Sequence, residues 1–137
     1  MDQRVSFITL VVTDLDTTRR FYVDGLGWEP EVDVPGEVLM FEVAEKVVLS
    51  MWVESGFVEE VGHAPARGGV PPVTLSHNLA TPQGVDTVLE QARAAGATQV
   101  GEAVERDWGG YTGYFADPDD FRWEVAHNPG PIGRTVL

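Results

Sequence analysis

The sequence contains no cysteine, which excludes disulfides, a thiolate nucleophile and thiolate metal ligands. Basic residues are also scarce, with 9 Lys and Arg against 22 Asp and Glu and a net charge of −13. Such a negative field repels nucleic-acid phosphates and anionic membrane surfaces, so we expect neither as a partner. No apolar run approaches the roughly 20 residues that span a bilayer, and no basic and apolar leader opens the chain. We therefore expect a cytoplasmic protein.

The residues that are present are sufficient for a core, because 43% of the 137 residues are hydrophobic. Their pattern predicts one strand, one helix and three strands, twice in succession. The expected strands are residues 5–12, 28–32, 38–43 and 47–53, then 73–80, 99–105, 111–115 and 121–126; the expected helices are 13–23 and 82–95. Thr13 and Thr81 are expected to cap the helices, and Gly96 to end the second in a left-handed conformation.

We expect a single domain, residues 1–137, in which module one is 1–54, a connector is 55–72, module two is 73–128 and a tail is 129–137. The connector is rich in glycine and proline and has room for a short helical turn at 57–61. A surface link between the modules is the favoured interpretation, and a functional lid is the alternative. Neither module can close a core alone, so the pattern predicts an α+β fold of two tandem βαβββ modules around a central cleft for a small molecule.

Two segments carry a resemblance to a known family. The first is VTDLDTTRRFY at residues 12–22 followed by GLGW at 25–28, and the second runs from WGGY at 108–111 to YFADPDDFRWE at 114–124. Together and in this order they resemble the vicinal oxygen chelate superfamily, the glyoxalase, bleomycin resistance protein and dioxygenase group. The family's usual glycine in the last turn is replaced by Asp120, a residue type that tolerates the left-handed conformation.

The resemblance implies four positions where metal-dependent relatives hold a divalent ion, one in the first and one in the last strand of each module. Here they fall on Phe7, on Leu49 or a neighbour, on Thr74 or His77, and on Glu124. Phenylalanine and leucine cannot coordinate a metal. At most Glu124 and His77 remain, fewer than the three protein ligands of usual open zinc sites. We therefore expect no cofactor; a divalent metal held by Glu124 and His77, or completed across a dimer, is the alternative.

Strand alternation separates the residues of the expected strand 73–80 into two faces. Thr74, Ser76 and Asn78 share one face, and His77 belongs to the other, more apolar face. That face should lie beneath the helix, which predicts that His77 is a half-buried structural histidine with a hydrogen-bond partner. Coordination of a metal by His77 is the alternative interpretation.

Glu124 is the candidate catalytic residue. Its carboxylate could be balanced by Arg122 or by a neighbouring hydroxyl, or could have a raised pKa and act as a general base. The structural alternative is a carboxylate that hydrogen-bonds backbone amides. Trp108, beside two glycines, is the candidate for stacking on a ligand. The full set expected to line the ligand pocket is Phe7, Thr9, Leu49, Met51, Thr74, Ser76, Asn78, Trp108, Tyr111, Arg122 and Glu124.

Three functions remain open from the sequence. The first is a metal-free protein of the bleomycin-resistance kind that binds an aromatic or otherwise flat small molecule. The second is an enzyme of the superfamily, a lyase, isomerase or dioxygenase, that uses Glu124 as a base or metal ligand. The third is an interaction module with an acidic surface. The resemblance also implies a homodimer, and it favours neither of the first two functions because function depends on the site and not the fold.

Overall fold

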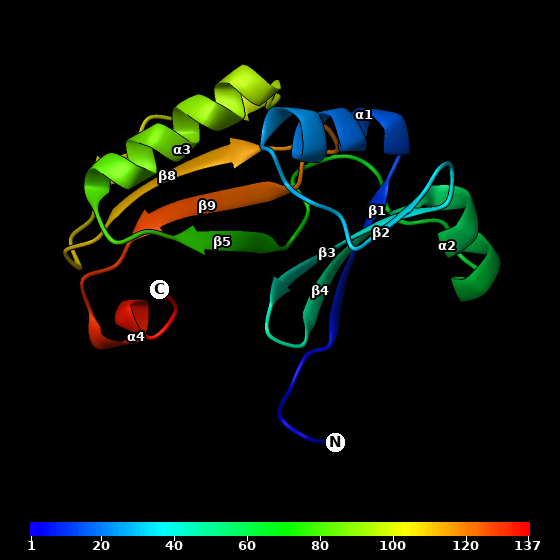
Figure 1. Cartoon of the computed structure of the whole chain (residues 1–137), viewed down its shortest axis with the longest axis horizontal. Helices are drawn as coiled ribbons and strands as arrows, with labels where there is room; N and C mark the ends of the chain where they lie inside the picture. The colour runs from blue at the N-terminus through cyan, green and yellow to red at the C-terminus, as the bar shows by residue number, and fades with distance from the viewer. The chain divides into compact units, whose positions relative to one another are not determined.

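A computed structural model describes all residues from 1 to 137. In it the chain divides into two compact units, each with its own sheet. Unit 1 is Met1–Arg67 and unit 2 is Gly68–Leu137. Both follow the order strand, helix, strands, which confirms the predicted α+β class (Figure 1). None of the helices combines the length and the hydropathy that a membrane-spanning segment needs.

The sheet of unit 1 has the strand order β1-β4-β3-β2. Strands β1 and β4 pair in parallel, and the other two pairs are antiparallel. The strands are β1 (Phe7–Val12), β2 (Val32–Val34), β3 (Val38–Ala44) and β4 (Val47–Val53); the helical segments are α1 (Leu15–Arg19), the π-helical η1 (Arg20–Gly25) and α2 (Glu54–Val61). Helix α2 therefore occupies the first part of the expected connector, and it is longer than the helical turn that we expected at 57–61.

An aromatic cluster packs the helical segment of unit 1 onto its sheet. Tyr22 on η1 and Phe41 on β3 are buried, with ring centroids 6.0 Å apart. The ring of Trp28 lies 5.2 Å from each of them. Because Phe41 points toward the helix, its neighbour Met40 belongs to the opposite face of the sheet.

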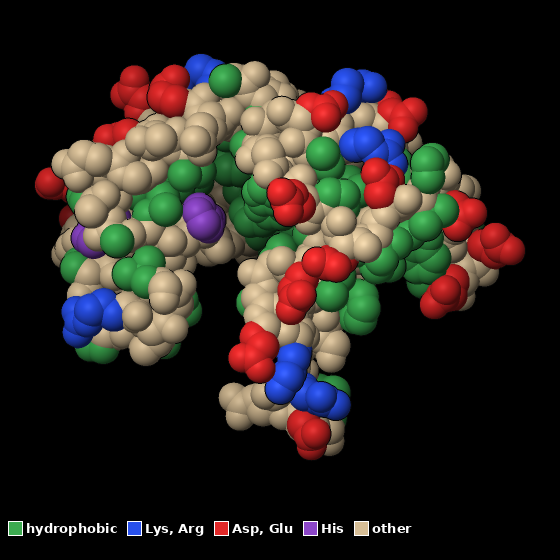
Figure 2. Space-filling view, in the orientation of Figure 1, with side chains coloured by type: hydrophobic (Ala, Val, Ile, Leu, Met, Phe, Trp, Pro, Cys, Tyr) green, Lys and Arg blue, Asp and Glu red, His purple; other side chains and the backbone are tan.

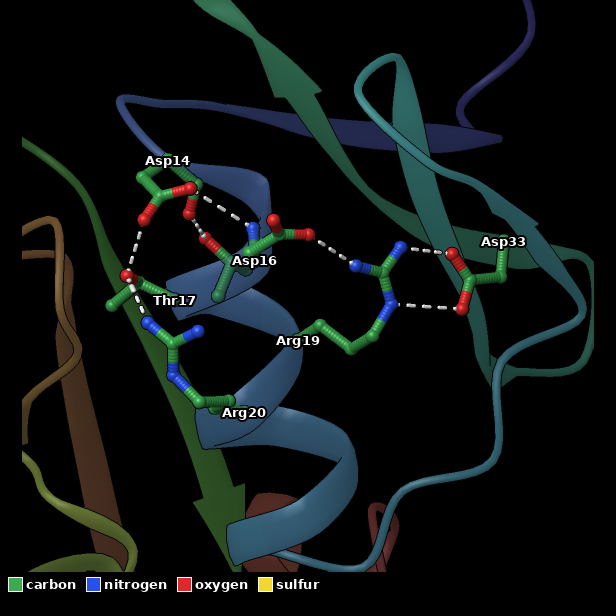
Figure 3. Close-up of polar contacts among 7 residues, drawn as sticks. Asp14, Asp16, Thr17, Arg19, Arg20 and Asp33 are labelled. Carbon is green, nitrogen blue, oxygen red and sulfur yellow. Dashed lines mark hydrogen bonds and ion pairs between the residues drawn. The ribbon is translucent and has the colours of Figure 1, made fainter.

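The predicted strand at 28–32 is wrong: β2 begins at Val32. Trp28 instead lies just after the helical segment. Its backbone N–H donates to the carbonyl of Tyr22, and its ring joins the aromatic cluster. The predicted cap is also wrong by one residue. Asp14, not Thr13, is the N-cap of α1, and its carboxylate accepts from the backbone N–H of Asp16 (Figure 3).

The sheet of unit 2 has the strand order β5-β9-β8-β6, with β7 also paired to β8. Its elements are β5 (Thr74–Asn78), α3 (Pro82–Ala95), β6 (Gln99–Val100), β7 (Val104–Glu105), β8 (Tyr111–Ala116), β9 (Arg122–His127) and α4 (Pro131–Arg134). The single strand expected at 99–105 is therefore two short strands, because the chain leaves the β8 ladder between Val100 and Val104. The predicted cap Thr81 and the left-handed Gly96 are both confirmed.

Helix α3 covers β8 and β9, as Figure 1 shows. Gly113 on β8 faces the helix so closely that an added Cβ atom would lie 2.5 Å from Leu89 Cδ1. Strand alternation then directs Thr112 and Tyr114 to the opposite face of the sheet. The turn between β8 and β9 is held by buried Asp117, which accepts from the N–H groups of Asp119 and Phe121, and Asp120 adopts the expected left-handed conformation with φ 68°.

Candidate functional site

The face of the unit 2 sheet that points away from α3 carries a row of polar side chains. Strand register produces this row, because Ser76 on β5 is paired with Glu124 on β9, and Glu124 is paired with Tyr114 on β8. Directly paired residues present their side chains on the same face of a sheet. Three polar side chains from three strands therefore meet, with the half-buried Glu124 in the middle.

Both oxygens of the Glu124 carboxylate accept a hydrogen bond from a hydroxyl. Tyr114 Oη donates to Oε1 at 2.6 Å, and Ser76 Oγ donates to Oε2 at 2.9 Å. No ion pair joins Glu124 to Arg122. Of the partners that we expected for the Glu124 carboxylate, which were Arg122, a hydroxyl or backbone amides, the structure shows hydroxyls. The bond to Glu124, together with desolvation, raises the pKa of Tyr114 above its ordinary value.

Arg106 extends this row toward the turn between β7 and β8. Its Nε donates to Thr112 Oγ1 at 2.6 Å, and Thr112 is only 1% exposed. Thr112 lies on β8 two residues before Tyr114, on the same face of the sheet. Our sequence reasoning missed Arg106, although its position two residues before Trp108, in a chain with few basic residues, was an available signal.

Trp108 lies at the tip of the same turn and is 56% exposed. Its ring covers Gly110, where an added Cβ atom would lie 1.8 Å from Trp108 Cη2. Gly109 has φ 86°, and the N–H of Arg106 donates to the carbonyl of Gly110 at 2.8 Å. The glycine pair therefore permits the turn to fold and lets the indole ring pack against the backbone at Gly110, with apolar surface still exposed.

Tyr111 does not belong with Glu124, contrary to its place in the expected pocket. It points to the α3 side of the sheet, where its Oη donates to Asp86 at 2.9 Å. That bond is also the main reason why the pKa of Tyr111 is raised. Tyr111 and Asp86 line a groove of about 680 Å³, together with Arg106, His127 and the start of α3. Arg106 therefore borders this groove as well as bonding Thr112 on β8.

Two residues of unit 1 expected in the pocket are instead in the core. Leu49 is 1% and Met51 0% exposed, and both share the face of the sheet that carries Phe41 and packs beneath the helical segment. The prediction that they line a pocket is therefore wrong. Phe7 and Thr9 do lie on the other face and are exposed, and Ser50, paired with Thr9, is the β4 residue beside them.

His77 is exposed, so the prediction of a half-buried histidine beneath the helix is wrong. It does lie on the face opposite Ser76, as alternation predicted. The reason for its exposure is its strand: β5 is the edge of the sheet, and α3 packs on β8 and β9. Thr74 and Asn78 share the face of Ser76, paired with Arg122 and Ala126 respectively.

The donor set does not fit a divalent metal ion. No three His, Asp or Glu side chains form a group that could hold one. Glu124 is the single carboxylate of its row, both of its oxygens bind hydroxyls, and His77 is on the other face of the sheet. A site with two or fewer protein ligands falls short of the three that open catalytic zinc sites use.

The chain matches the Glyoxalase/Bleomycin resistance protein/Dioxygenase superfamily over residues 4–125. It belongs to this superfamily. A solved structure described as a glyoxalase-related enzyme from Fulvimarina pelagi is 35% identical to this glyoxalase-superfamily chain, with a TM-score of 0.82 over 93% of this chain and 89% of that one. A glyoxalase/bleomycin resistance protein/dioxygenase from Nocardioides is 27% identical, with a TM-score of 0.74 over 95% and 89%.

A lactoylglutathione lyase from Agrobacterium tumefaciens shares the fold, at 21% identity and a TM-score of 0.70 over 93% of this chain and 96% of that one. A comparison with curated proteins gives no match. The recognised family thus agrees with the resemblance carried by the first helix and the last hairpin. The superfamily hosts both binding proteins and enzymes, so the function of this member must be argued from its own residues.

Proposed function

We propose that this superfamily member is a metal-free binding protein for a small aromatic molecule, with Glu124 as the residue that anchors the ligand. The observation that carries the proposal is the Glu124 carboxylate, held between Tyr114 Oη and Ser76 Oγ on the face of the sheet away from α3. Such a carboxylate is fixed in position but is not neutralised by a cation.

The chemistry of the carboxylate decides what it can bind. A carboxylate has about four acceptor sites, and two of those on Glu124 receive hydroxyl protons. The others can accept from an O–H or N–H group of a ligand. A hydrogen bond to a charged group contributes about 1.5–3 kcal/mol, enough for a tenfold or larger effect on affinity. Exposed Trp108 in the same unit supplies a flat apolar surface for a ring.

The first experiment measures ligand binding by NMR chemical-shift titration with a set of phenols and anilines. Glu124→Gln keeps the shape of the side chain but removes the charge, so we expect affinity to fall at least tenfold. Glu102→Gln is the matched control, because Glu102 is an exposed carboxylate of the same unit outside the polar row. Equal affinity of the wild type and Glu124→Gln for every ligand would contradict the proposal.

A second experiment tests the absence of a metal requirement. Calorimetric titration with zinc, nickel, iron, manganese and magnesium should give no stoichiometric binding, because no three ligands converge. Tight binding of one ion per chain that is lost in Glu124→Gln would contradict the proposal and favour a metal-dependent member of the superfamily.

A specific contact favours an enzyme as the second candidate. Tyr114 and Glu124 are two titratable groups only 2.6 Å apart, an arrangement suited to proton transfer, and the relative of 35% identity is described as an enzyme. In that case Glu124 would accept a proton from the substrate. Any lyase, isomerase or dioxygenase turnover found in a substrate screen should then fall at least a hundredfold in Glu124→Gln. Unchanged turnover would exclude Glu124 as the base.

A further inference from the structure

Arg106 lacks an acidic partner in a chain that has more than twice as many acidic as basic residues. Five of the other eight basic side chains form ion pairs with carboxylates, and Arg20, Arg122 and Arg134 form none; the five are Arg4, Arg19, Lys46, Arg67 and Arg93. No ion pair joins Arg106 to any carboxylate, although Glu105 and Asp107 flank it. Its charge is therefore not neutralised within the chain.

The guanidinium is nevertheless held in one place. Its Nε donates at 2.6 Å to the hydroxyl of Thr112, which is itself buried. The backbone of Arg106 is fixed as well, by hydrogen bonds to Gly109 and Gly110 across the turn. The hydrogen bond uses Nε, so the two terminal nitrogens remain available as donors. Paired donors of this kind match the two oxygens of a carboxylate.

This cation lies near the anchoring carboxylate. Thr112 and Tyr114 are two residues apart on one face of β8, which corresponds to about 7 Å along the strand. The pKa of Tyr114 reflects both neighbours: the hydrogen bond to Glu124 raises it most, and the positive charge of Arg106 acts in the opposite direction. A single small molecule could therefore reach a hydrogen-bond acceptor at one end and a cation at the other.

We propose that Arg106 binds an anionic group of the ligand, a carboxylate in the simplest case, while Glu124 accepts a hydrogen bond from a donor at the ligand's other end. This inference rests on the proposed function and specifies its ligand class: an aromatic acid with a hydrogen-bond donor about 7 Å from the acid. Thr112 is a positioning residue that acts through Arg106. With a net charge of −13, the protein as a whole repels such an anion, so its binding needs a local cation, which Arg106 supplies.

The test uses two probes of equal shape, para-hydroxybenzoate and para-hydroxybenzamide, titrated into the full-length protein by NMR. The wild type should bind the acid more tightly than the amide. Arg106→Gln should weaken the acid by about tenfold to a hundredfold and leave the amide unchanged, and Arg106→Lys should retain part of the preference. Arg93→Gln, which removes the same charge from the exposed pair with Glu90 on α3, should change neither affinity.

Two further outcomes separate this inference from the proposed function. If the amide and the acid bind equally, Arg106→Gln changes neither and Glu124→Gln weakens both, Arg106 binds no anion and the binding function stands. If neither probe binds the wild type while other phenols or anilines do, this inference fails and the binding function stands. Chemical unfolding of each variant provides the structural control, because a merely structural Arg106 would lower stability and weaken both probes alike.

Discussion

At the scale of the residue, the bond between Tyr114 and Glu124 links the protonation of one side chain to the other. The phenol donates to the carboxylate at 2.6 Å, so the bond exists only while Tyr114 keeps its proton. The pKa of Tyr114 is raised in the folded protein, mainly by this bond. The bond's contribution to stability is therefore complete below the ordinary tyrosine pKa and is lost as the pH rises through the higher, folded value.

This linkage gives a prediction at alkaline pH. In Glu124→Gln the acceptor no longer carries a charge, so the pKa of Tyr114 should move back toward the ordinary value of about 10. NMR titration of ring-labelled tyrosine would measure it, with Tyr111 as the internal control because its pKa is raised by Asp86 instead. An unchanged titration of Tyr114 in the variant would show that the bond is not formed in solution.

Gly110 gives a second prediction at this scale. In Gly110→Ala the new methyl group would occupy the space of the Trp108 ring, 1.8 Å from Cη2, and the ring must move. Since the ring is exposed and its side chain can rotate, we expect a stability change below about 1 kcal/mol but a shifted Trp108 fluorescence and weaker binding of aromatic ligands. Gly101→Ala, where an added Cβ has an ordinary contact, is the control. Unaltered aromatic binding would exclude Trp108 from the ligand site.

At the scale of the element, Arg19 joins the first helix to the edge strand β2, as Figure 3 shows. Its guanidinium binds the Asp33 carboxylate through two nitrogens, with Nε at 2.9 Å from Oδ2, and binds Asp16 at 2.8 Å. Asp33 belongs to β2, whose three residues are all exposed. The bidentate ion pair therefore adds a side-chain link between α1 and a poorly buried strand whose backbone pairs with β3.

Asp33→Asn should destabilise the protein by about 0.5 kcal/mol at neutral pH, a modest value because the pair is partly exposed. The hydrogen bond from Arg19 lowers the pKa of Asp33, so this stabilisation is present above the ordinary value of 3.8 and is lost as the pH falls through the lower, folded value. Urea unfolding of the wild type and the variant across this range should show the difference shrink toward zero. Asp24→Asn, at an exposed residue of η1, is the control, and a difference that stays constant with pH would contradict the ion-pair account.

The elements also show what the sequence could predict. Long segments with clear periodicity were predicted correctly, as for α3 with its cap Thr81 and its stop at Gly96. The strand at 28–32 was wrong because aromatic packing, a tertiary contact, holds Trp28 against Tyr22. The alternation of residues along a strand predicts which side chains share a face of the sheet, but not which residues of the neighbouring strand lie beside them. Only the observed register shows that Ser76 meets Glu124.

The site was predictable in part for the same reason. Family motifs located Glu124, and alternation separated Ser76 from His77. The sequence could not show that α3 leaves the edge strand uncovered, which exposes His77, or that Leu49 rather than Ser50 points to the core. Arg106 was missed because an unpaired charge is recognised only when the partners of all other charges are known.

At the scale of the whole molecule, negative charge dominates the surface. On the face that Figure 2 shows, acidic side chains are spread over both units, and basic side chains are fewer. We expect no measurable binding to duplex DNA at physiological salt, because the protein repels phosphates. Fluorescence anisotropy with labelled DNA checks this, and saturable binding would contradict it. The homodimer stays a prediction, which sedimentation equilibrium can test.

The pairing of strands also determines where the chain can be interrupted. The first and last strands of each unit lie next to each other, β1 with β4 and β5 with β9, and no ladder runs from one sheet to the other. The stretch from 62 to 73, between α2 and β5, contributes no strand or helix. A single proteolytic nick there, for example after Arg67, would therefore break a covalent bond while leaving the hydrogen bonds of both sheets intact.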